Sequence, residues 1–151
     1  MLGSLNNEQI DRLLSAEVVG RVACHAEGRT YVVPVTYAYD GSTIYGHTGE
    51  GMKVRMMRQN PDVCFEVDRM ENMANWQSVI AWGRFEELHG TAAAHAMGLL
   101  MDRLLPLISS DTAAPTHGLD PSDVHRADVA GRHAVVYRIV IREKSGRFEK
   151  R

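Results

Sequence analysis

The 151-residue sequence has few cysteines, no long apolar run and no excess of one charge sign. Its two cysteines, Cys24 and Cys64, lie in separate apolar stretches rather than in a CxxC pair, so we expect buried thiols and no metal centre. A formal net charge of -2 lacks the basic excess of a general nucleic-acid-binding protein. The most apolar segment, residues 97–108, is interrupted by charged residues and a proline and is too short to cross a bilayer.

The N-terminal sequence MLGSLNNEQIDRLL has neither the basic region nor the apolar region of a signal peptide. Together with the absences above, this predicts a cytoplasmic protein without nucleic-acid or membrane partners. The length suits one compact domain, residues 1–151.

The hydrophobic patterns predict a mainly β protein with flanking helices. Apolar, β-branched and aromatic residues indicate six strands, over residues 18–26, 30–40, 42–45, 62–68, 76–88 and 133–146. We expect three helices, one capped by Ser4 or Asn6, one over 52–59, and one from Thr91 to about Leu107. Most connections are hairpin-like, which favours a six-stranded antiparallel β-barrel over a doubly wound parallel sheet.

Three local signals refine these strands. Pro34 has no N–H to donate, which predicts an edge position, a bulge or a backbone turned toward a ligand. Asp40-Gly41 predicts a hairpin turn, and Gly83 predicts a β-bulge.

The stretch TIYGHTGEGMKVRMMRQNP joins a strand to a helix and gathers residues suited to an anion. A helix that begins near Gly51 presents free N–H groups with partial positive charge. Lys53 lies in its first turn, where the helix dipole disfavours a cation unless an anion shares the position. Thr48 offers a hydroxyl, and Arg55 and Arg58 add positive charge. This pattern fits a seat for one phosphate monoester and, equally well, a solvated helix start.

Two common nucleotide motifs are excluded at this junction. A P-loop requires Ser or Thr after its lysine, whereas Val54 follows Lys53. A GxGxxG fingerprint fails because no third glycine follows Gly49-Glu50-Gly51.

Four stretches, in this order and spacing, resemble a known family: GRVACHAEGRTYVVPVTYAYDGSTIYGHT, GMKVRMMRQNPDVCFEVD, WQSVIAWGRFEEL and VVYRIVIREKSGR. The chain resembles the pyridoxamine 5'-phosphate oxidase-like, FMN-binding split-barrel proteins, in particular the small subgroup that includes nitroimidazole-resistance proteins. The resemblance implies a six-stranded split β-barrel and a homodimer with FMN at the subunit interface.

The resemblance also implies how the phosphate would be held. Lys53 matches the family lysine that pairs with the FMN phosphate. Gly51 and Met52 occupy the neighbouring positions, where the larger enzymes often have Ser and Arg. This departure removes one positive charge, for which Arg21 or Arg55 could compensate.

Further positions match strands that line the flavin. His47 and Thr48 match the strand end near the ring and the ribityl chain, and His47 could donate or relay a proton. Gln77 and Ser78 match a polar pair that points toward the flavin. The residues whose backbone would run along the isoalloxazine ring are Val33, Pro34, Val35 and Thr36.

The function implied by the resemblance is that of a flavin-dependent oxidoreductase acting on a small molecule such as a nitro-aromatic. A non-enzymatic flavin carrier or redox-responsive binding module is the alternative. A split barrel that binds haem or a deazaflavin is a further alternative, and haem would need an axial ligand such as a histidine of the late loop.

Overall fold

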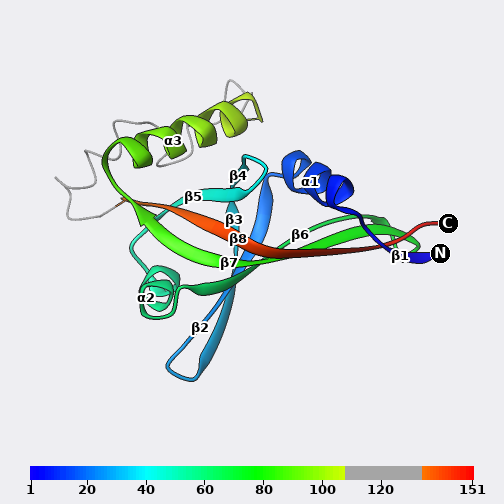
Figure 1. Cartoon of the computed structure of the whole chain (residues 1–151), viewed down its shortest axis with the longest axis horizontal. Helices are drawn as coiled ribbons and strands as arrows, with labels where there is room; N and C mark the ends of the chain where they lie inside the picture. The colour runs from blue at the N-terminus through cyan, green and yellow to red at the C-terminus, as the bar shows by residue number, and fades with distance from the viewer. Residues whose placement is uncertain (108–133) are drawn as a thin grey trace.

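The computed structural model describes residues 1–107 and 134–151. Within them the chain forms eight strands and three α-helices, with a short 3-10 turn, Leu105–Leu107, after the last helix (Figure 1). The helices are α1 (Asn7–Ala16), α2 (Met52–Gln59) and α3 (Gly90–Leu104). The strands are β1 (Leu2–Ser4), β2 (Val19–Ala26), β3 (Arg29–Thr36), β4 (Ala38–Tyr39), β5 (Thr43–Gly49), β6 (Asp62–Asn72), β7 (Asn75–Leu88) and β8 (Ala134–Glu149).

All strands belong to one antiparallel sheet in the order β3-β2-β6-β7-β8-β5-β4, and β1 pairs with the end of β8. The sheet curls so that the edge strand β3 also contacts β5, which gives a mainly β, antiparallel split barrel. The β2–β3 hairpin projects away from the rest of the sheet on the side opposite α3 (Figure 1).

The predicted fold class is confirmed, although eight strands form instead of six. The additional strands are the short β1 and β4. The chain leaves the β3 ladder at Tyr37, whose side chain is buried and whose backbone N–H donates to the Val18 carbonyl at 3.1 Å. The predicted strand 30–40 is therefore divided in two by one residue that turns into the core.

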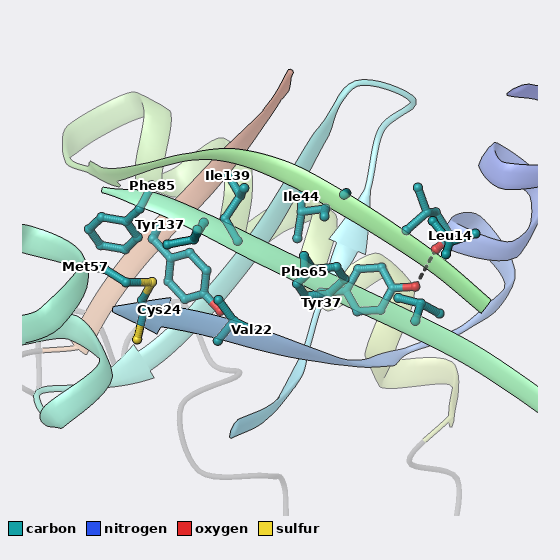
Figure 2. Packing of buried hydrophobic residues seen from close by; sticks show 14 of the residues in the cluster. Leu14, Val22, Cys24, Tyr37, Ile44, Met57, Phe65, Phe85, Tyr137 and Ile139 are labelled. Atoms are coloured by element: carbon teal, nitrogen blue, oxygen red, sulfur yellow. Dashed lines mark hydrogen bonds between the residues drawn. The ribbon is translucent and has the colours of Figure 1, made fainter. Parts of the chain in front are cut away.

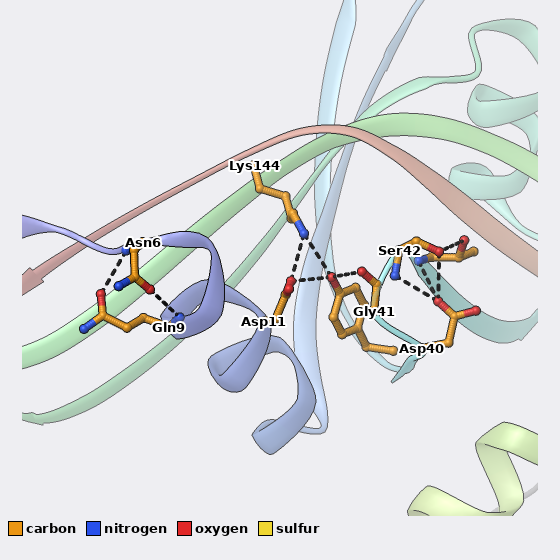
Figure 3. Close-up of polar contacts among 9 residues, drawn as sticks. Asn6, Gln9, Asp11, Asp40, Gly41, Ser42 and Lys144 are labelled. Carbon is orange, nitrogen blue, oxygen red and sulfur yellow. Dashed lines mark hydrogen bonds and ion pairs between the residues drawn. The ribbon is translucent and has the colours of Figure 1, made fainter.

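The local signals are confirmed. Pro34 lies on β3, at an edge of the sheet, where its missing N–H costs no ladder bond. The β7–β8 register shifts between Trp82 and Gly83. Asp40 and Gly41 form the turn between β4 and β5, with Gly41 at a φ of +104° and the Asp40 carboxylate accepting from the Ser42 N–H at 3.0 Å (Figure 3).

The main core fills the inside of the curled sheet and is closed by α1 and α2 (Figure 2). Tyr37 packs edge-on against Phe65, with ring centroids 5.0 Å apart, and its hydroxyl donates to the Leu14 carbonyl at 2.6 Å. α2 contributes the fully buried Met57. A second, smaller cluster joins α3 to β4, β5 and β8. The buried face of α2 thus fixes where its N-terminus lies.

Helix α1 is also tied to the sheet by polar contacts. The Lys144 ammonium on β8 donates to the Asp11 carboxylate at 2.8 Å and to the Tyr39 hydroxyl at 3.2 Å (Figure 3). No helix within residues 1–107 and 134–151 has the length and apolar character needed to cross a membrane.

Candidate functional site

The start of α2 lies directly after β5 and has no side-chain cap. Gly51 is the N-cap residue, its backbone is extended with a φ of -176°, and no side-chain cap is formed. The first intrahelical bond runs from the Arg55 N–H to the Gly51 carbonyl at 3.2 Å, so the N–H groups before Arg55 have no partner within the helix. A Cβ placed on Gly49 or Gly51 would meet no atom within 4 Å. The helix start therefore faces open space, as an anion seat requires.

Lys53 lies half-buried in this first turn. Burial lowers the pKa of its ammonium, and Cys24 of β2 is close enough to interact with it electrostatically. Burial also raises the pKa of the Cys24 thiol, which therefore stays protonated near neutral pH and supplies no negative charge. Lys53 forms no hydrogen bond or ion pair with any of the described residues. A half-buried cation at the positive end of a helix is thus left for an external anion to neutralise.

Arg58 was predicted to add positive charge at this junction, but its charge is paired with two carboxylates. Its guanidinium donates to both Glu50 oxygens at 2.9 and 2.7 Å, and to the Glu87 carboxylate at 2.7 and 3.1 Å. These hydrogen bonds raise the pKa of Arg58 and neutralise its charge. Arg58 therefore links the loop before α2 to β7 through two ion pairs. The sequence alone does not predict these contacts.

The two arginines proposed to replace the charge missing at Met52 differ in position. Arg21 lies 3.5 Å from the carboxylates of Glu66 and Asp68, so its charge is already used. Arg55 is exposed on α2 and forms no ion pair with the described residues. Of the two, only Arg55 is available at the helix start.

The predicted ring-lining residues of β3 and β5 flank the same region. His47 and Thr48 are half-buried on β5, pair with Val136 and Val135 of β8, and precede Gly49 and α2. On β3, side chains alternate between the half-buried inner face and the exposed outer face. The half-buried ones are Val33 and Val35, and the exposed ones are Pro34 and Thr36. Because β3 contacts β5 within one chain, both strands lie near the point where α2 begins.

Gln77 and Ser78 are not brought to this region by the same chain. Ser78 pairs with Asp68 on β6, whereas α2 leads into β6 at Asp62, which pairs with Arg84. Six residues of strand separate Asp62 from Asp68, which corresponds to about 20 Å. The predicted polar pair therefore lies well along β7 from the point where α2 leads into β6.

Two neighbours of the seat were missed by sequence reasoning as site residues. Cys24 was predicted only as a buried thiol, yet it lies beside Lys53. Arg29 follows the Glu27–Gly28 turn, whose residues have φ values of 51° and 75°, and its Nη1 reaches the Met52 sulfur at 4.0 Å. The turn signal was recognised, but only the packing of α2 against β2 shows that this turn lies beside the helix start.

The described residues contain no group of side chains arranged to hold a metal ion. The late-loop histidines, His117 and His125, lie outside the described residues.

Comparison with known proteins identifies the class to which this split barrel belongs. The pyridoxamine 5'-phosphate oxidase family model matches residues 6–148, and the chain belongs to that family. An uncharacterised protein of Rhizobium meliloti is 32% identical over 91 residues, which cover 60% of this chain and 60% of that protein.

Solved structures give the same fold. The structure of a FAD-binding protein of Mesorhizobium loti matches with a TM-score of 0.77 and 28% identity, over 99% of both chains. A candidate 5-nitroimidazole antibiotic resistance protein of Bacteroides thetaiotaomicron matches with a TM-score of 0.72 and 18% identity, over 98% of this chain and 87% of that one. At that lower identity the likeness concerns the fold alone.

Proposed function

We propose that this chain binds the FMN portion of a flavin, with the phosphate at the start of α2. The observation that carries the proposal is the half-buried Lys53 ammonium, unpaired among the described residues, beside the uncapped N–H groups of the helix. A phosphate there accepts hydrogen bonds from the backbone and neutralises the ammonium. Membership of the family and the FAD-binding relative from Mesorhizobium loti support a flavin as the phosphate-bearing ligand.

The neighbouring strands suit the rest of such a ligand. Val33 and Val35 pack against the main core and are half-buried, so the backbone of β3 would line the ring, and Thr48 offers a hydroxyl at the end of β5. His47 is the candidate proton donor in this set, because an imidazole N–H can donate to a ring or substrate atom. When bound, a flavin supplies hydride transfer between a reduced nicotinamide and an acceptor such as a nitro-aromatic. The protein would thus act as a flavin-dependent oxidoreductase on a small molecule, contributing position and electrostatics.

Replacing Lys53 by alanine tests this proposal directly. Titration of the apoprotein by flavin fluorescence should show FMN binding weakened by about 10- to 100-fold, the loss of one charge-assisted phosphate contact. Riboflavin, which lacks the phosphate, is the matched control and should bind equally to both proteins. Unchanged FMN affinity in Lys53→Ala, or equal losses for both flavins, would count against the phosphate seat. Hydride transfer from NADH or NADPH to a nitro compound then separates an oxidoreductase from a flavin carrier.

The partner in this proposal is a second copy of the chain. Side chains paired across four strands give an apolar row on the outer face of the sheet: Val32, Ala23, Cys64 and Trp82. Val32 is 61% exposed there. A second copy seated on this face would cover the row and could supply Gln77 and Ser78, which in one chain lie well along β7 from the point where α2 leads into β6.

Sedimentation equilibrium tests the dimer. Wild type should give about twice the 16.8 kDa mass of the chain, and Val32→Glu should shift it toward monomer by placing a charge in the covered row. A monomeric wild type at micromolar concentration would rule the dimer out.

A further inference from the structure

One arginine of α2 holds two carboxylates that come from different segments of the chain. Arg58 lies in the last turn of the helix, Glu50 lies in the loop before the helix, and Glu87 lies on β7. Both oxygens of Glu50 accept from the guanidinium, at 2.9 and 2.7 Å. Both oxygens of Glu87 accept from it as well, at 3.1 and 2.7 Å. Because a bidentate pair fixes the direction of a carboxylate, the Glu50 carboxylate is held at Arg58.

The place of Glu50 in the sequence makes it a natural competitor for the anion seat. It directly precedes the N-cap Gly51, and the helix start that follows attracts negative charge. Its neighbours Gly49 and Gly51 border open space, so the loop has room to turn the side chain toward the helix start. Burial and Cys24 account for the lowered pKa of Lys53, so Glu50 is not the group that neutralises this ammonium. The carboxylate nearest the seat in sequence is therefore directed away from it.

We propose that Arg58 is a positioning residue that keeps the Glu50 carboxylate out of the anion seat at the start of α2. The inference rests on the proposed function, because this seat is the one assigned to the phosphate of the ligand. Once Arg58 is removed, Glu50 turns to the open N–H groups and the Lys53 ammonium and competes with the phosphate. The chain thus carries an internal competitor for its own seat, and the ion pair with Arg58 sets the fraction of protein that can bind.

Anchoring of the helix is the other role that these ion pairs could have. The buried face of α2, with Val54 and Met57, already fixes the helix against the core. Loss of Arg58 should therefore leave α2 in place and free the Glu50 side chain. Glu87 directs the guanidinium from β7, whereas Glu50 is the group that the guanidinium withholds, so the two carboxylates have separable roles.

The test measures the affinities of the apoprotein for FMN and riboflavin by flavin fluorescence, and their ratio reports on the seat. Arg58→Ala should lower the ratio of FMN to riboflavin affinity by about 3- to 10-fold, because a carboxylate at the helix start competes with the phosphate. Arg58→Met, which keeps an apolar stem, should lower it equally. Arg58→Ala/Glu50→Gln should restore the wild-type ratio, because the competing charge is gone. Thermal unfolding should show that the double variant stays less stable than wild type, because the pair with Glu87 is still missing.

Two matched variants separate this effect from anchoring and from general charge. Glu87→Gln leaves the pair between Arg58 and Glu50 in place, so it should lower the ratio less than Arg58→Ala does. If the pairs served only to anchor α2, Glu87→Gln would be as damaging as Arg58→Ala, and this result would overturn the inference. Arg12→Ala removes an exposed arginine paired with Glu8 on α1 and should leave the ratio unchanged.

The remaining outcomes distinguish this inference from the proposed function. A wild-type ratio in both Arg58 variants would show that Glu50 does not compete, and so would a lowered ratio that Glu50→Gln fails to restore. Either result overturns the inference and leaves the phosphate seat intact. A ratio that Lys53→Ala does not change would instead overturn the seat, and this inference with it.

Discussion

Helices α1 and α2 begin in opposite ways. At α1 the Asn6 side chain accepts from the Gln9 N–H at 2.9 Å, and the Gln9 side chain accepts from the Asn6 N–H at 2.9 Å (Figure 3). Glu8 adds a negative charge to that first turn. At α2 the N-cap is Gly51 and no acidic residue lies in the first turn. Lys53 occupies the second helical position, which Glu8 occupies in α1.

The difference is that the side chains of α1 cap its own N-terminus, whereas those of α2 do not. Both helices are held by buried faces, through Leu13 and Leu14 in α1 and through Val54 and Met57 in α2. Because packing supplies most of the stability of a short helix, α2 can form without a cap. A helix start that breaks the local rules while the rest of the helix follows them is typical of a functional site. Helix α3 also begins without a side-chain cap, so the feature that sets the start of α2 apart is the half-buried Lys53 in its first turn, which suits the proposed phosphate seat.

Giving α2 a capped start like that of α1 should produce the largest change in stability and in FMN affinity. Gly51→Asp adds a cap and a negative charge where the backbone is already extended and open, and should stabilise the apoprotein by about 0.5–1 kcal/mol. The same carboxylate would occupy the anion seat, so FMN affinity should fall at least as far as in Lys53→Ala. Asn6→Ala should cost about 1 kcal/mol and leave FMN affinity unchanged. Thermal unfolding and flavin titration measure both quantities.

Gly51→Asn separates capping from charge in that experiment. It can cap the helix without placing a carboxylate beside Lys53, so it should retain more FMN affinity than Gly51→Asp. If Gly51→Asp stabilises the apoprotein and still binds FMN as tightly as wild type, the phosphate does not sit at this helix start.

Sequence reasoning predicted the fold better than the site, for identifiable reasons. Strand alternation and the signals at Pro34, Asp40 and Gly83 depend on a few neighbouring residues, and all were confirmed. The bounds of α2 were predicted because Gly51 and Pro61 limit it on either side. The charge of the site depends on contacts between distant segments. Arg58 is neutralised by Glu87, 29 residues away, and no local pattern reports that contact.

The dependence on contacts between distant segments also explains why Arg21 was proposed from the sequence and Arg29 was not. Arg29 comes from a turn that the sequence showed plainly, but its position beside Met52 follows from the packing of α2 on β2. Arg21 was an equal candidate in sequence, and the β2–β6 register instead pairs it with Glu66. Long-range register therefore decides which charges are free for a ligand.

A smaller expected effect is the pH dependence that Lys53 gives to apoprotein stability and to FMN affinity. Burial holds the pKa of Lys53 below its usual 10.5, so the folded apoprotein gives up this proton before the unfolded chain does. In the alkaline window below 10.5, the unfolded chain binds more protons, and the contribution of Lys53 makes the apoprotein more stable as pH rises. FMN binding has the opposite sign, because the phosphate requires the ammonium, and affinity falls as pH rises through the pKa of Lys53. The ratio of FMN to riboflavin affinity isolates this effect, since changes in the ring cancel. The ratio should fall toward high pH in wild type and stay flat in Lys53→Met, and a flat wild-type ratio would show that the ammonium does not contact the phosphate.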